Sequence, residues 1–258
     1  MIFSIEIFLV GIAAAMLFTI GLVARNLHRK AQSRDKELEQ LKAQVLEWNR
    51  RLEEKVSERT KTLEGLHNQL QETYLETVTA LTEAVSAKDT HLFGHAHNVA
   101  TYARTIANEM GFSRERTDRL AQGCELHDLG KIAIPDAILT KAGPLTPQEY
   151  EIVKQHPRWG AQILEPLTFM KDITEMVLQE HERWDGSGYP QELKGEQIRL
   201  EARIIAVADA LDAMTAERPY RKRIPLQEAA EALKRCAGTQ FDPKVVEHCL
   251  KAIREGKL

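Results

Sequence analysis

Hydrophobic residues are arranged along this chain in three successive patterns, and the first is a continuous apolar run. Residues 1–24 are almost wholly apolar, with Glu6 as the one charge, and about 20 apolar residues suffice for a helix to cross a bilayer. Arg25 and Arg29 follow, and basic residues beside a membrane helix usually remain in the cytoplasm. We therefore predict a transmembrane anchor over 1–24 and a single-pass protein of the inner (cytoplasmic) membrane, with the rest of the chain in the cytoplasm. A cleaved signal peptide is the alternative, but its basic residues would precede the apolar run.

The second pattern, from about residue 31 to residue 79, is a polar helix with a narrow apolar stripe. Its apolar residues alternate spacings of three and four, as the a and d positions of a coiled coil do, with one skip of the stutter type. The stripe consists of Leu38, Leu41, Val45, Trp48, Leu52, Val56, Leu63, Leu66 and Leu70. A lone solvated helix is the alternative, yet such a helix is marginal in water without a partner. We predict a coiled-coil linker over residues 25–79 that forms a parallel homodimer.

The third pattern, over residues 80–258, is that of a globular all-α domain. Apolar residues recur at helical spacing, and a capping box at Thr146 and the pair Asp242-Pro243 each indicate a helix start. A long apolar helix is expected over 200–214, and the glycine-rich stretch 184–195 is expected to form an ordered loop between helices. The sequence contains no convincing strand alternation. The fold class expected is a helical bundle, preceded by the coiled-coil helix and one transmembrane helix.

Composition limits the partners of this domain. With 35 Lys and Arg against 38 Asp and Glu, the net charge of −3 gives no basic footprint for a nucleic-acid duplex. An anionic ligand must therefore be held by a local basic cluster, such as the one around Arg218 and Arg221. The three scattered cysteines fit a reducing compartment and no disulfide framework.

Histidines and aspartates are the residues of the domain that indicate chemistry. The pair His127-Asp128 is weak evidence alone, but further candidates occur on both sides of it. Asp209 lies within the expected apolar helix, where an unpaired carboxylate is costly to bury and metal ligation removes that cost. An ordinary salt-bridged acid is the alternative. The other candidate ligands are His95, His156 and His181.

The mixture of imidazole and carboxylate predicts a centre with two divalent ions. Such ions lie roughly 3.5–4 Å apart and clamp the attacking and leaving oxygens of a phosphate ester. Asp128 is the natural bridge between them, and nitrogen with oxygen ligands suits Fe, Mn, Ni or Zn rather than Ca. Lys131, expected on the same helix face as His127 and Asp128, is placed to neutralise a phosphate oxygen, although a surface lysine is the alternative.

Several motifs, in order, resemble the HD-GYP phosphodiesterases: HDLGKIAIPD, LTPQEYEIVKQHPRWG, HERWDGSGYPQELKGEQI, ARIIAVADALDAMTAERPYR and GTQFDP. The resemblance implies an all-α HD domain that hydrolyses c-di-GMP to pGpG or GMP with two or three metal ions. Fe or Mn is favoured as the metal, and Ni or Zn is the alternative. It implies the metal ligands His95, His127, Asp128, His156, His181 and Asp209. It also implies substrate contacts at Lys131, Gly188, Tyr189, Pro190, Arg218 and Arg221.

The sequence departs from this family where a pair of histidines is usual. Glu180 stands in place of the first, and it is a candidate ligand that would add negative charge and favour harder ions. His91, four residues before His95, is a candidate for a third metal. Two other functions remain open: a receptor that binds a cyclic dinucleotide without turnover, and an HD phosphohydrolase for another nucleotide.

Overall fold

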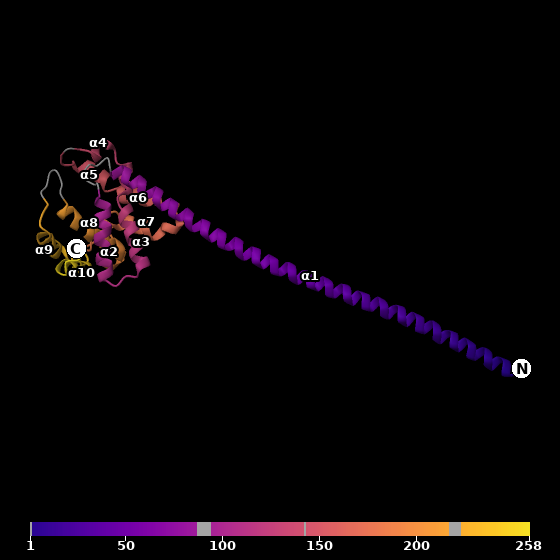
Figure 1. Ribbon diagram of the computed structural model, residues 1–258. Coiled ribbons are helices and arrows are strands. Elements are labelled where there is room, and N and C mark those ends of the chain that lie inside the picture. The colour runs from indigo at the N-terminus through magenta and orange to yellow at the C-terminus, as the bar shows by residue number, and fades with distance from the viewer. Residues whose placement is uncertain (1, 87–93, 142, 217–222) are drawn as a thin grey trace. The chain divides into compact units, whose positions relative to one another are not determined.

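The computed structural model describes residues 2–86, 94–141, 143–216 and 223–258. Within these ranges the regular structure is helical and contains no β-strand, which confirms the predicted all-α fold (Figure 1). The α-helices are α1 (Ile2–Ser86), α2 (His95–Glu109), α3 (Arg114–Leu126), α4 (Asp136–Leu139), α5 (Pro147–Val153), α6 (His156–Leu164), α7 (Lys171–Gln179), α8 (Leu200–Thr215), α9 (Leu226–Cys236) and α10 (Pro243–Arg254). Short 3-10 helices are η1 (Leu129–Ala133), η2 (Thr168–Met170) and η3 (Gly195–Gln197).

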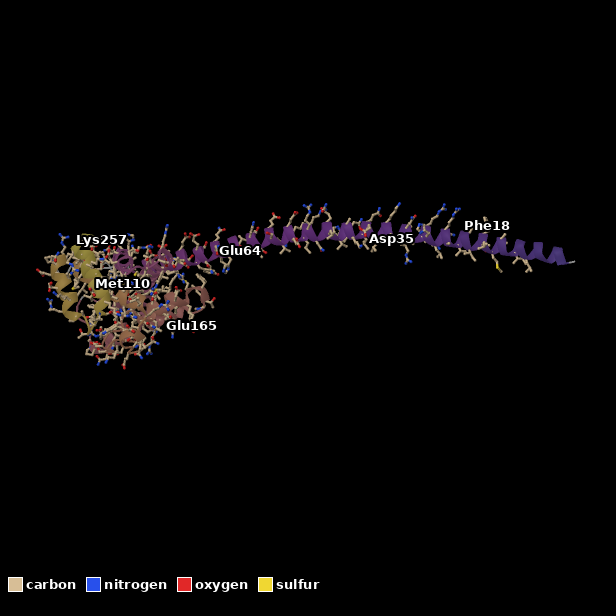
Figure 2. The ribbon with its side chains drawn as sticks, turned by 90° about the horizontal axis from the view of Figure 1, so that it is seen from below. Phe18, Asp35, Glu64, Met110, Glu165 and Lys257 are labelled. Carbon is tan, nitrogen blue, oxygen red and sulfur yellow. The ribbon has the colours of Figure 1, made fainter. Side chains whose placement is uncertain are left out.

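By its internal contacts the chain divides into two units, residues 1–69 and residues 70–258. The first unit contains the part of α1 before residue 70, from which side chains such as Phe18, Asp35 and Glu64 project (Figure 2). The second unit contains the end of α1 and the other described helices. The predicted domain boundaries after residues 24 and 79 are not tested by this division and stay predictions.

The predicted transmembrane anchor is contradicted. In the part of the chain that the structure describes, no helix is both long and apolar enough to cross a membrane. The predicted single-pass location in the inner membrane was therefore wrong.

The main core of the second unit surrounds α2, which packs against α3, α8 and α10 (Figure 1). Fully buried side chains such as Ile106, Leu120 and Leu211 fill it. A second buried cluster joins the end of α3 and η1 to α6 and α7, with Leu129 and Val177 among its members. The ends of α2, α3, α6 and α7 are thereby held close to the middle of α8.

Two of the predicted helix starts have the expected caps. In the capping box of α5, the Thr146 hydroxyl accepts from the Glu149 backbone N–H at 3.2 Å, and the Glu149 carboxylate accepts from the Thr146 N–H at 2.7 Å. Asp242 caps α10 by accepting from the Lys244 N–H at 2.8 Å. The apolar run expected over 200–214 is α8, and stretch 184–195 contains no α-helix.

Gly130 allows η1 to lie directly against the start of α6. A Cβ atom at this position would come within 1.9 Å of the backbone oxygen of His156, so any side chain would force the two segments apart. This close approach brings His156 next to Asp128, which immediately precedes η1.

Candidate metal centre

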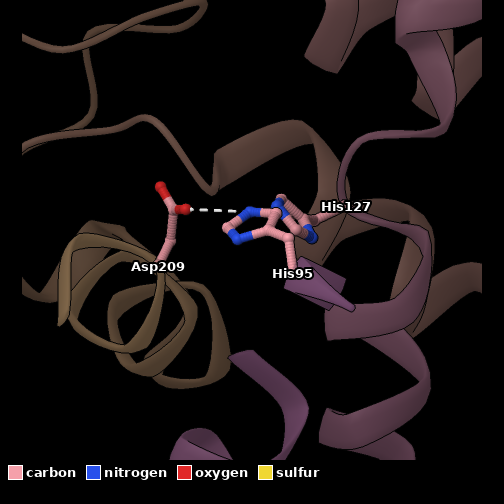
Figure 3. Close-up of side chains that lie close together, drawn as sticks. All are labelled: His95, His127 and Asp209. Atoms are coloured by element: carbon pink, nitrogen blue, oxygen red, sulfur yellow. Dashed lines mark ion pairs between the residues drawn. The ribbon is translucent and has the colours of Figure 1, made fainter. Parts of the chain in front are cut away.

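Four histidines reach a common site from the ends of helices. His95 and His156 are the first residues of α2 and α6. His127 directly follows α3, and His181 lies two residues after the end of α7. Asp209 reaches the same site from within α8, and Figure 3 shows it facing His95 and His127. The secondary structure therefore collects side chains far apart in sequence around one point.

Three of these imidazole rings are oriented by a hydrogen bond at Nδ1. The Nδ1 atom of His127 lies 2.6 Å from the Cys124 carbonyl oxygen, and that of His156 lies 2.7 Å from the Val153 carbonyl oxygen. The Nδ1 atom of His95 lies 2.6 Å from a carboxylate oxygen of Asp212. Because a carbonyl or carboxylate oxygen only accepts, each Nδ1 donates, and Nε2 is left to face the site.

Two of the inward Nε2 atoms face carboxylate oxygens that also carry lone pairs. His95 Nε2 lies 3.2 Å from Asp209 Oδ1, and His156 Nε2 lies 3.2 Å from Glu180 Oε1. A neutral ring and an ionised carboxylate would repel each other at these contacts, so each requires either a proton or a cation.

The pKa values of the groups at these contacts favour a proton there. Burial lowers the pKa of His95, but the carboxylates of Asp209 and Asp212 outweigh it and raise that pKa to about 9. Burial raises the pKa of Glu180 well above its ordinary value, although His127 opposes the shift. The contact of His95 thus holds a proton, the shift at Glu180 favours one there, and a bound metal ion would replace such protons.

Asp128 is the ionised carboxylate at the centre of the site. Burial raises its pKa, but Lys131 and the neighbouring histidines outweigh burial and hold that pKa well below the ordinary range. The Lys131 ammonium donates to Asp128 Oδ2 at 2.7 Å. Lys131 is thus beside Asp128, as predicted, but the shared helix face was wrong: α3 ends at Leu126, and Lys131 lies in the 3-10 helix η1.

Donor atoms of the described residues form three overlapping groups that could hold a metal ion, and within each group the atoms lie within 4.8 Å of one another. The groups are His95, His127 and Asp209; His127, Asp128 and Glu180; and His156, Glu180 and His181. The chemistry of this set, mostly buried imidazole and carboxylate, fits divalent ions such as Fe, Mn or Zn. His127 and Glu180 each occur in two groups, so the donors form one continuous centre.

A cavity of about 470 Å³ opens beside these donors and is lined by His181, Tyr189 and Asp209 among others. The Tyr189 ring lies against the His181 ring, with centroids 5.0 Å apart. Gly188 lets the loop reach this position, because a Cβ there would come within 2.3 Å of the Arg183 backbone nitrogen. The cavity is large enough and polar enough on one side to take part of a nucleotide.

The structure brings together most of the residues that the sequence predicted for the site. Lys131 and Tyr189 lie at the edge of one centre. The residues around this centre are His95, His127, Asp128, His156, Glu180, His181 and Asp209. His91, Arg218 and Arg221 lie outside the described residues. No part of this arrangement tests the roles assigned to these residues, which stay predictions.

Two buried acids of the site were not predicted as functional residues. Asp212 holds His95, and Glu182 accepts from the backbone N–H groups of Gln191 and Leu193 at 2.6 and 3.0 Å, which fixes the loop that carries Tyr189. The spacing of three between Asp209 and Asp212 put both on one helix face, and this was the available signal for Asp212. The only sequence signal for Glu182 was its position next to His181.

With this geometry established, sequence comparison places the chain in a known class. The profile of the HD domain family matches residues 79–245, and the chain belongs to this family. A cyclic di-GMP phosphodiesterase of Thermotoga maritima is 39% identical over 76% of this chain and 54% of that protein. The 3'3'-cGAMP-specific phosphodiesterase 2 of Vibrio cholerae is 38% identical over 70% of this chain and 35% of that protein. The chain thus spans about half of the first of these relatives and less of the second.

Among solved structures, the cyclic GMP-AMP specific phosphodiesterase V-cGAP3 of Vibrio cholerae is similar with a TM-score of 0.56. The match covers 71% of this chain and 49% of that one at 20% identity, which shows the fold alone. It confirms the predicted HD-type helical fold for the second unit.

Proposed function

We propose that this chain is an HD-GYP phosphodiesterase that hydrolyses c-di-GMP to pGpG, GMP or both in a metal-dependent reaction of bacterial signalling. The observation that carries the proposal is the continuous set of buried imidazole and carboxylate donors beside an open cavity of about 470 Å³. The names of the relatives, which act on cyclic dinucleotides, support the substrate class.

The proposed roles follow from where each side chain lies. The centre would hold two divalent ions, with Fe or Mn favoured over Ni or Zn. The proposed ligands are His95, His127, Asp128, His156, Glu180, His181 and Asp209. Such ions, when bound, make coordinated water more acidic and neutralise charge on a phosphate. The Lys131 ammonium, 2.7 Å from Asp128, adds a positive charge at the edge of the centre where a phosphate oxygen would gain negative charge.

The substrate would enter by the cavity beside the glycine-rich loop. Tyr189 lines this cavity with its ring towards His181, and such an aromatic face suits stacking of a base. Its neighbours Gly188 and Pro190 remain proposed substrate contacts. Arg218 and Arg221 remain proposed phosphate contacts, and His91 remains a proposed ligand for a third ion.

The proposed substrate has one competitor that an observation favours. The relative specific for 3'3'-cGAMP is nearly as similar to this chain as the c-di-GMP relative, at 38% against 39% identity. A receptor without turnover is the second alternative. Initial rates with c-di-GMP and with 3'3'-cGAMP, measured on the same Mn-loaded protein, separate these possibilities. We expect a higher kcat/KM for c-di-GMP; binding of both without product would identify a receptor.

We also propose that residues 25–79 form a parallel coiled-coil linker to a phosphodiesterase domain over 80–258. The predicted apolar stripe of α1 is exposed along its whole length in the single chain, from Leu38 at 51% to Leu70 at 53%. Burial of such a stripe against the same stripe of a second chain would stabilise both helices.

The decisive variant for the proposed reaction is Asp128→Ala. Removal of this central carboxylate should lower the bound metal by at least one ion per chain and abolish hydrolysis. Metal content by elemental analysis and product formation by chromatography check the expectation. Asp118→Ala, which removes an exposed carboxylate paired with Arg104, is the matched control and should keep both properties. Full metal content and full activity in Asp128→Ala would contradict the proposal.

A further inference from the structure

The two oxygens of the Glu180 carboxylate face two different sets of imidazole nitrogens. Oε1 lies 3.2 Å from His156 Nε2 and 3.9 Å from His181 Nε2, whereas Oε2 lies 3.8 Å from His127 Nε2. The side chain is almost completely buried, directly after the last residue of α7. One carboxylate therefore reaches both halves of the donor set.

Asp128 spans the same two histidines in the same way. Its Oδ2 lies 3.5 Å from His127 Nε2, and its Oδ1 lies 3.7 Å from His156 Nε2. The Asp128 and Glu180 carboxylates thus each have one oxygen towards His127 and the other towards His156. This is the arrangement that two bridging ligands between the same pair of metal ions would have.

The distances come close to those of shared coordination. Two ligand atoms that are each about 2.1 Å from one ion, at angles of 90–110°, are about 3.0–3.4 Å apart. The four contacts of Asp128 and Glu180 with His127 and His156 run from 3.2 to 3.8 Å. Small movements of side chains would bring each nitrogen and its facing oxygen onto one ion.

We propose that Glu180 is a second bridging carboxylate, which with Asp128 joins two divalent ions, so that this centre is held by two carboxylate bridges. The inference rests on the proposed function, because it requires a centre with two metals. It assigns Glu180 a role that a histidine at the same position could not fill, since an imidazole offers only one inward nitrogen.

The alternative of a Glu180 that holds a single ion explains less. A carboxylate bound through Oε1 alone would leave Oε2 facing His127 across 3.8 Å, which is too long for a hydrogen bond. A bridge instead uses both oxygens for coordination. Three carboxylates, those of Asp128, Glu180 and Asp209, would also bring three negative charges to two divalent ions and favour hard ions such as Mn.

The full chain loaded with Mn²⁺ provides the test. We would count Mn per chain by elemental analysis, titrate Mn affinity, and measure the magnetic coupling between the two ions from the temperature dependence of the electron paramagnetic resonance spectrum. The variants are Glu180→Gln, which keeps the shape but removes the charge, and Glu180→His, which leaves one inward nitrogen. Glu175→Gln is the matched control, because it makes the same change on α7 where the side chain pairs with Arg199.

We expect two coupled Mn ions in the native protein and in Glu175→Gln. Both Glu180 variants should bind the second Mn at least about tenfold more weakly and show weaker coupling when both ions are bound. If Glu180→Gln does not fold, as judged by circular dichroism, the result for Glu180→His decides. Unchanged Mn affinity and coupling in the folded variants, or a single Mn in the native protein, would overturn the inference.

The same experiment separates this inference from the proposed function. Two coupled ions that depend on Glu180, without hydrolysis of any cyclic dinucleotide, would refute the proposed function and leave the bridge in place. Hydrolysis together with unchanged coupling in Glu180→Gln would refute the bridge and leave the function in place.

Discussion

Asp212 shows how one buried acid can control a ligand that it does not replace. Its carboxylate lies 2.6 Å from His95 Nδ1 and is itself almost fully buried on α8. A carboxylate at this place fixes the tautomer and the ring orientation of a ligating histidine and makes the ring a better donor. Asp212 is therefore a positioning residue in the proposed site.

The variant Asp212→Ala should weaken metal binding by about 10–100-fold, because His95 would lose the partner that holds its ring. Calorimetric titration of Mn²⁺ into the metal-free protein measures the effect. The control variant Asp118→Ala removes an exposed aspartate and should bind Mn²⁺ as the native protein does. An Asp212→Ala protein with native Mn²⁺ affinity would show that the ring is held by packing alone.

Glu182 acts on the substrate side of the site rather than on the metals. Each of its oxygens accepts from a backbone N–H of the loop, at Gln191 and at Leu193. Hydrogen bonds to a charged group contribute about 1.5–3 kcal/mol, so Glu182→Ala should release the loop and displace Tyr189. We expect KM for c-di-GMP to rise roughly tenfold or more while the metal content stays native. Loss of metal in this variant would instead make Glu182 part of the metal centre.

At the scale of single residues, the sequence predicted the metal-binding residues better than the contacts that hold those residues in place. His127, Asp128 and Asp209 are recognisable because histidine next to aspartate, and aspartate in an apolar helix, are unusual. The inward direction of the His127 ring depends on a hydrogen bond from its Nδ1 to the backbone carbonyl oxygen of Cys124, and no side-chain pattern encodes that bond. The double contact of Glu180 likewise depends on where α3 and α7 end and where α6 begins.

Among the helices, those with strong apolar periodicity and clear caps were predictable. The run predicted over 200–214 is α8, and the caps at Thr146 and Asp242 begin α5 and α10. The continuation of a helix from His127 to Lys131 was not correct. Gly130, with η1 pressed against α6, makes a tight 3-10 turn the better solution there, and this contact exists only after folding.

Asp242 links two helices, so its replacement should cost more than the loss of a cap. It caps α10 and also accepts from the Arg203 guanidinium of α8 at 2.6 Å, and it is 2% exposed. Loss of a cap costs about 1 kcal/mol, and a buried charge left without its partner costs about 3–5 kcal/mol. Asp242→Ala should therefore lower the free energy of unfolding by several kcal/mol.

Urea denaturation at neutral pH measures this loss, and Thr146→Ala is the matched control. Thr146 caps α5 on the surface through its hydroxyl, so its replacement should cost only about 1 kcal/mol. Equal losses in the two variants would mean that the pair of Arg203 with Asp242 contributes nothing beyond the cap.

At the scale of the whole molecule, the two units obtain their stability in different ways. Residues 70–258 bury a large apolar core, whereas the stripe residues of α1 are exposed in the single chain, with Val45 at 46% and Trp48 at 71%. Isolated polar helices are marginal in water, and apolar side chains at a and d spacing are stabilised when a second helix covers them. The exposed stripe therefore favours a second copy of this chain as its partner.

The parallel homodimer predicts a specific difference between neighbouring positions of α1. Replacing Leu41 and Val45 by lysine places two charges on the stripe and should shift the chain from dimer to monomer at micromolar concentration. Replacing Gln40 and Leu46 by lysine adds the same number of charges off the stripe, where both side chains are exposed, and should leave the dimer intact. Sedimentation velocity distinguishes the two species. The variant Leu41→Cys tests the relative orientation of the two α1 helices. A parallel dimer brings this residue next to its own copy and permits a disulfide, whereas an antiparallel dimer separates the two copies. A native chain that sediments as a monomer, or one that the Leu41 and Val45 changes leave dimeric, would exclude the stripe as the interface.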